Sequence, residues 1–197
     1  MDQSGSTGDP EAPAGGSWAT PSQPVQPGPV GFVYADVPNR AIAYIIDAIL
    51  VGIVSIVAFA IIGGIGLNVL SGLEVNYFAS LILAVVSLAI SGAYFLYTWT
   101  AMRGTVGMKV LGMQVGNAGD GKTLTMDQAV RRWIALGAPF GLAQALSPLP
   151  AIGSLLGLAA LGWFIYLLWT TYKSPTKQGY HDVFANTMVV KAARSAG

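Results

Sequence analysis

The sequence predicts an all-α membrane protein with four transmembrane helices and a small cytoplasmic β-hairpin and strand. Hydrophobic residues make up 53% of the chain and charged residues only 10%, whereas soluble domains average about 25% charged residues. Long apolar stretches and an uneven distribution of Lys and Arg point the same way. We expect both termini to lie in the cytoplasm.

The N-terminal segment differs in composition from the rest of the chain. Residues 1–31 contain six prolines and six glycines but few branched apolar residues. Such a segment buries too little apolar surface to offset its ordering entropy. We therefore predict a disordered cytoplasmic tail over 1–31, a four-helix transmembrane domain over 32–191, and a short C-terminal tail over 192–197.

Composition excludes several classes of site. The chain has no cysteine, which excludes disulfides and thiol chemistry, and its one histidine, His181, excludes a His-rich metal centre. The net charge is only +1, and without a basic face we expect no nucleic-acid partner. We predict no cofactor and no metal.

The apolar stretches define the spans. The first span is predicted over 41–65 and the second over 77–100. The third apolar region, 133–172, is too long for one helix across a bilayer core of about 30 Å. Ser147-Pro148-Leu149-Pro150 interrupts it, so we predict helices over 130–146 and 151–172. A re-entrant hairpin in this region is the alternative.

Basic residues set the orientation, because Lys and Arg stay on the cytoplasmic side. They cluster in 102–132 and after the last span, and the two remaining connections contain none. The residues are Arg103, Lys109, Lys122, Arg131 and Arg132 in the first cluster, and Lys173, Lys177, Lys191 and Arg194 in the second. Four spans place both clusters in the cytoplasm, whereas three would put the C-terminal cluster outside.

The cytoplasmic segments carry turn and cap signals. We predict a strand over 109–115, a turn over 117–121 and a returning strand over 122–124. Thr125 and Gln128 form a capping-box pattern that opens a helix. A strand over 187–191 is expected to pair with 109–115. His181 and Asp182 are expected to begin a short helix after Gly179.

One segment also matches a nucleotide-binding pattern. Gly116-x-x-x-x-Gly121-Lys122-Thr123 fits the P-loop consensus. A P-loop needs an α/β sheet whose helix begins at the lysine, and about 30 residues between spans are too few for one. We interpret the segment as a glycine-rich turn.

A polar stripe follows the first span. Arg40 and Asp47 are seven residues apart, and Tyr44 lies between them, so the three side chains share one helix face. A carboxylate in a span costs about 2.5–3.5 kcal/mol on insertion scales, so we expect it to be paired. One interpretation is a structural ion pair, joined to Asp182 and Arg131 in one network. The other is a proton or ion relay.

These residues resemble the RDD family of bacterial membrane proteins, which is named for one arginine and two aspartates. Arg40, Asp47 and Asp182 look like those three residues, and Thr187 to Val190 looks like the strand that follows the second aspartate. The segment from Gly104 to Gly112 is similar to the family's loop. Val106 stands where proline is usual, and Met108 displaces the lysine by one position. The resemblance covers about residues 38–191.

The resemblance implies a multi-pass protein of the bacterial inner membrane. Some members of the family are linked to ion transport and others look like accessory subunits. We expect a non-enzymatic accessory or scaffolding protein held by an Arg-Asp-Asp network. The alternative is a small ion or proton transporter with Asp47 as carrier. Expected partners are the lipid bilayer and other membrane proteins, or a second copy bound through Gly153 and Gly157.

Overall fold

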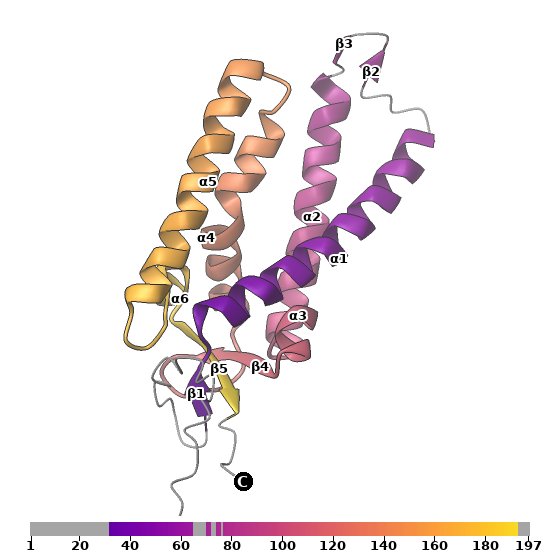
Figure 1. Ribbon diagram of the computed structural model, residues 1–197. Coiled ribbons are helices and arrows are strands. Elements are labelled where there is room, and N and C mark those ends of the chain that lie inside the picture. The colour runs from indigo at the N-terminus through magenta and orange to yellow at the C-terminus, as the bar shows by residue number, and fades with distance from the viewer. Residues whose placement is uncertain (1–31, 65–69, 72–73, 76, 193–197) are drawn as a thin grey trace, which may run out of the picture.

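Four long helices stand over a small β-sheet in the computed structural model of the chain (Figure 1). The structure describes residues 32–64, 70–71, 74–75 and 77–192. The long helices are α1 (Val37–Gly64), α2 (Tyr77–Ala101), α4 (Met126–Ala145) and α5 (Pro150–Lys173). The predicted N-terminal tail, 1–31, lies outside the described residues, and so does the predicted C-terminal tail, 192–197, except for Ala192, which ends strand β5 (Thr187–Ala192).

Three of these helices are long and apolar enough to cross a membrane. Among the described residues, the candidate spans are Val37–Ile62, Tyr77–Ala101 and Ala151–Lys173. Helix α4 was expected to be a further span. It carries Asp127, Arg131 and Arg132 in its first two turns, and it is too polar to be one of these candidate spans. The predicted helices are thus present, but the count of four spans is not confirmed.

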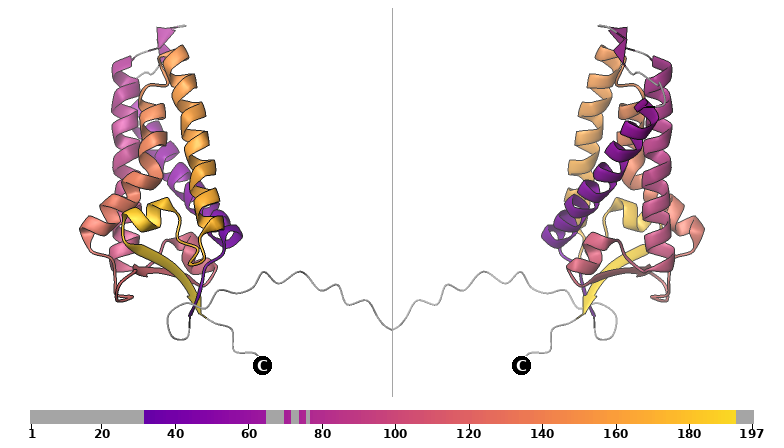
Figure 2. Two further views of the ribbon diagram at one scale, coloured as in Figure 1. Left: turned by 90° about the vertical axis from the view of Figure 1, so that its left-hand side faces the viewer. Right: turned by 90° about the vertical axis from the view of Figure 1, so that its right-hand side faces the viewer.

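The helices are unequally packed. Helix α4 lies between α2 and α5 and contacts both closely, as Figure 2 shows from two sides. Helix α1 crosses the bundle at an angle (Figure 1). It contacts α2 and the short helix α3 (Val106–Val110) but meets α5 only sparsely. Apolar side chains such as Ile49, Val85 and Leu158 are exposed along the outer faces, as expected of a protein surrounded by lipid.

The small sheet joins the two ends of the described chain. Strand β5 (Thr187–Ala192) lies between β1 (Phe32–Tyr34) and β4 (Met113–Asn117), antiparallel to both. Val115 pairs with Val189, which confirms that the C-terminal strand pairs with the strand of the 102–132 segment. A second sheet pairs β2 (Leu70–Ser71) with β3 (Glu74–Val75). Strand β1 was not predicted.

Two predictions for the 102–132 segment are wrong. Residues 109–110, predicted to begin a strand, are the end of helix α3, which Thr105 caps by accepting a hydrogen bond from the Met108 N–H. Gly112 then adopts a φ of +68°, a left-handed conformation suited to glycine, and lets the chain leave α3 for β4. Residues 122–124 form no strand. The turn closes with two backbone bonds, from the Asn117 N–H to the Lys122 carbonyl and from the Gly121 N–H to the Asn117 carbonyl.

The predicted cap signals are confirmed. Thr125 and Gln128 form the expected capping box at the start of α4. Pro150 occupies the first turn of α5, where a missing N–H costs nothing. Helix α6 (Tyr180–Phe184) begins after Gly179. The buried core, which includes Ala43, Trp99, Met113, Val115 and Val189, connects the sheet to the nearby ends of α1, α2 and α4.

Candidate functional site

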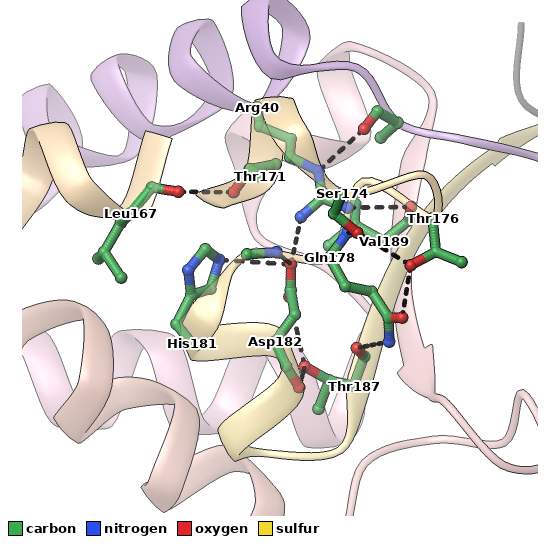
Figure 3. A network of polar contacts seen from close by, with 12 residues as sticks. Arg40, Leu167, Thr171, Ser174, Thr176, Gln178, His181, Asp182, Thr187 and Val189 are labelled. Carbon is green, nitrogen blue, oxygen red and sulfur yellow. Dashed lines mark hydrogen bonds and ion pairs between the residues drawn. The ribbon is translucent and has the colours of Figure 1, made fainter. Parts of the chain in front are cut away.

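Asp182 is the centre of the most heavily bonded polar cluster. Its side chain is completely buried at the start of α6. Oδ2 accepts hydrogen bonds from Arg40 Nη1 at 2.5 Å and from the Gly179 N–H at 3.1 Å. Oδ1 accepts from Arg132 Nη1 and from Thr187 Oγ1. Figure 3 shows Arg40 and Thr187 approaching this carboxylate from different elements.

The two arginines bring distant parts of the chain to Asp182. Arg40, on α1, also donates from Nε to the Ala35 carbonyl at 3.0 Å and from Nη2 to the Val189 carbonyl at 3.4 Å. Arg132, on α4, also donates to Thr187 Oγ1 at 2.6 Å. The cluster therefore ties α1, α4, α6 and β5 together.

The charges around Asp182 keep it ionised. Burial by itself raises the pKa of this carboxyl, but the positive charges of Arg132 and Arg40 lower it, and the net result is a pKa well below the usual range. Together, the two guanidinium groups and the one carboxylate carry one surplus positive charge. We call this cluster of Arg40, Arg132 and Asp182 the ionic junction.

His181 stays neutral beside this junction. Burial lowers its pKa to about 4, and the charges of Arg132 and Arg40 act in the same direction, against the opposing effect of Asp182. Its Nε2 lies 3.5 Å from Asp182 Oδ2 (Figure 3). At neutral pH the imidazole is therefore uncharged.

Asp47 belongs to a separate cluster. It is 2% exposed, and its Oδ1 accepts from Tyr94 Oη at 2.7 Å and from the Gly107 N–H at 2.8 Å. Tyr94 Oη in turn accepts from the Val106 N–H at 3.1 Å. Asp47 and Tyr94 together satisfy the free amides at the start of α3, as helix capping requires.

The expected pairing of Arg40 with Asp47 is therefore wrong. The seven-residue spacing does place both side chains on one helix face, where they line a common cavity with Tyr44. Side chains on a helix tilt toward its N-terminus, so Arg40 points away from Asp47 and toward the sheet. Tyr44 packs its ring 6.0 Å from that of Phe164.

The second arginine of the cluster is Arg132 and not Arg131. Arg131 is exposed and pairs with Asp127 one turn earlier, with its Nε 3.0 Å from Oδ2. The spacing of four between Asp127 and Arg131 is a signal of a surface ion pair. Neighbouring residues of a helix point about 100° apart. An arginine that pairs with the exposed Asp127 therefore lies on the outer face of α4, and its neighbour Arg132 lies on the buried face.

The cavity itself has a volume of about 70 Å³. It lies where α1, α2, α4 and α5 converge, and Arg40, Asp47, Arg132 and His181 contribute to its wall. The described part of the chain contains no group of three His, Asp or Glu side chains placed to hold a metal ion.

Comparison with known protein families identifies a match. The model of the RDD family matches residues 34–186, a range that includes Arg40, Asp47 and Asp182. No curated protein and no solved structure matches the chain.

A first prediction concerns the ionic junction. Arg40→Ala removes the hydrogen bonds that Arg40 donates to Asp182 Oδ2 and to the Ala35 and Val189 carbonyls, and buried bonds of this kind contribute about 0.5–3 kcal/mol each. We expect a large drop in the thermal unfolding midpoint of the protein in non-ionic detergent. Arg131→Ala is the matched control, because it removes an exposed pair worth about 0–1 kcal/mol. Equal midpoints for the two variants would contradict the junction.

A second prediction concerns pH. His181 in the unfolded chain has a pKa near 6.5, whereas in the folded protein it lies at about 4. Between these values the unfolded state binds a proton that the folded state does not, so stability falls as the pH falls. The loss is about 3 kcal/mol over this window.

The chain's single histidine makes this test specific. Unfolding midpoints of the wild type and of His181→Gln are measured from about pH 7.5 to about pH 4.5, a range that covers most of this window. We expect the variant to lose most of the dependence on pH. An unchanged slope in the variant would show that another group is responsible.

Proposed function

The chain belongs to the RDD family of membrane proteins, and we propose that it is a non-enzymatic accessory or scaffolding protein of the bacterial inner membrane. The observation that supports this proposal is that the buried charged groups around Asp182 are held in place by hydrogen bonds and ion pairs. Both oxygens of Asp182 are engaged, by two arginines, an amide and a hydroxyl. Such an arrangement suits a rigid framework, since a group that binds and releases a solute must change its partners.

The outer face of α5 supports a contact with another membrane helix. Gly157 is exposed on this helix, and an added Cβ there meets nothing within 4 Å. Small residues let helices approach closely in a membrane. Gly153, the other residue of the expected pair, packs against the turn between α4 and α5. An added Cβ there would lie only 2.7 Å from the Ser147 Cα, so the turn requires a glycine at this position. We propose an association surface centred on Gly157.

We propose that α4 is the fourth span and that both termini are cytoplasmic. Its 20 residues reach about 30 Å at about 1.5 Å per residue, which matches the hydrocarbon core. Its charges lie in the first two turns, on the side of the sheet. The basic residues of the 102–132 segment and of the C-terminus favour the cytoplasm for that side.

This topology predicts the labelling of two introduced cysteines. The chain has none of its own, so Ser147→Cys and Asp120→Cys each provide a single thiol at an exposed position. In intact cells an impermeant maleimide should label the first and label the second only after lysis. Labelling of Asp120→Cys from outside would reject the topology.

A second candidate function rests on a second cavity. A space of about 400 Å³ lies between α1, α2 and α4, and its wall includes Ser55, Ser87 and Gln144. It shares Tyr44 and Phe95 with the inner cavity. Two neighbouring spaces with polar side chains in their walls favour a pathway for a small ion or proton, with Asp47 as carrier.

Flux measurements separate the two functions. Purified protein is placed in liposomes that contain a pH-sensitive dye, and pH or cation gradients are applied. We expect no flux above that of empty liposomes. A flux that disappears in Asp47→Asn would promote the transporter, provided that the variant stays folded. The amide oxygen that this substitution introduces can still accept from Tyr94 and Gly107, so the fold should persist.

A further inference from the structure

The inner cavity has one polar end and one apolar side. Arg40, Arg132 and His181 form the polar end, on the side of the sheet. Phe164 and Leu168, both on α5, contribute to the apolar side. Its volume of about 70 Å³ is several times the ~10–15 Å³ that one water molecule needs on this measure. A cavity of this character matches a molecule that has a small polar head and an apolar chain.

The polar end contains buried donors without a partner. Of the residues that line the cavity, Trp99, Arg132 and His181 each have a buried nitrogen without a hydrogen-bond partner: Nε1, Nε and Nδ1 respectively. Trp99 and Arg132 are 1% and 2% exposed, and their two nitrogens can only donate. They come from neighbouring side chains, since the Arg132 guanidinium lies 5.2 Å from the centre of the Trp99 ring. Buried donors of this kind call for an acceptor.

The charge balance at the polar end of the cavity favours an acceptor with one negative charge. Arg40 and Arg132 share the single charge of Asp182 there, which leaves one positive charge in excess. Asp47 contributes its negative charge to another part of the cavity wall, where Tyr94 and the first turn of α3 stabilise it. A carboxylate is a monoanion small enough for this space, and its oxygens accept from donors on neighbouring side chains.

The apolar side reaches the surface between two helices. Tyr44 on α1 and Phe164 and Leu168 on α5 are each half-buried, and α1 and α5 contact each other sparsely. Figure 1 shows the two helices diverging away from the sheet. An alkyl chain whose head lies at Arg132 can therefore extend between them toward the lipid.

We propose that this cavity binds the carboxylate head of a single-chain fatty acid, with the chain leaving between α1 and α5. The head accepts hydrogen bonds from Arg132 Nε and Trp99 Nε1, and the first carbons of the chain pack on Phe164 and Leu168. This proposal is independent of the proposed function, since either a scaffold or a transporter can hold a lipid at this place.

Quenching of tryptophan fluorescence tests the position of the head. The full-length protein is placed in nanodiscs of phosphatidylcholine at mildly alkaline pH, and 2-bromodecanoate is added, because its bromine lies next to the carboxylate. We expect saturable quenching that is mostly lost in Trp99→Phe and retained in Trp169→Phe, whose indole is exposed on α5. Quenching that does not saturate, or that is the same in both variants, would overturn the proposal.

A pair of substitutions on α5 tests the path of the chain. Leu168→Trp fills the apolar side of the cavity and should weaken binding of decanoate at least tenfold, as measured by the rise of the unfolding midpoint. Leu158→Trp is the matched control on the outer face of the same helix, and it should bind as the wild type does. Equal binding by the two variants would overturn the proposal.

Related probes test the head group. Decyltrimethylammonium has the same chain with a positive head, acetate has the head without the chain, and phosphatidylglycerol offers a phosphate head. We expect none of them to reproduce the effect of decanoate at the same concentration. An equal effect of the cation would show that the site does not select an anion. An equal effect of acetate would show that the alkyl chain does not contribute to binding. An equal effect of phosphatidylglycerol would show that the site binds a phosphate head and not a carboxylate, and each of these outcomes would overturn the proposal.

Discussion

The buried carboxylate of Asp182 is the constraint on which the rest of the structure depends. A charge removed from water must be compensated by opposite charges and by hydrogen bonds on its remaining oxygen positions. Here the compensation comes from Arg40 on α1, Arg132 on α4, and groups next to α6. These partners are separated by as many as 142 residues in the chain. The C-terminal segment is thus fixed beneath the bundle, and β5 can complete the sheet.

Asp47 is a second buried carboxylate, and hydrogen bonds stabilise it instead of an ion pair. Within the described part of the chain it pairs with no cation; it accepts from a tyrosine hydroxyl and from a backbone amide in the first turn of α3, where the helix dipole favours a negative charge. This contact requires α3 to approach α1 closely. Gly107 makes the approach possible, since an added Cβ would lie 2.2 Å from the Ala43 carbonyl oxygen. Asp47 therefore holds the first turn of α3 against α1, and Asp182 holds the C-terminal segment against α1 and α4.

The sequence allowed the helices, the cap at Thr125, the pairing of the C-terminal strand and the importance of Arg40, Asp47 and Asp182 to be predicted, because each depends on local spacing or on the cost of a charge among apolar residues. It did not reveal which cation meets which carboxylate. That choice depends on the tilt of side chains along α1 and on a rotation of about 100° between Arg131 and Arg132. Helix α3 and strand β1 were missed because both are short and are stabilised by contacts with distant segments.

The position of α4 explains why it is less apolar than the three candidate spans. A helix that faces lipid all round must be apolar all round, whereas one enclosed by neighbours needs apolar residues only where it is exposed. Helix α4 lies between α2 and α5, and its first turns carry a capping box and Arg132. These polar residues lower its mean hydropathy, yet they form the contacts with Asp182 and with the Asn186 carbonyl that attach the sheet to the bundle. The least apolar of the long helices is therefore the one through which the polar junction is built.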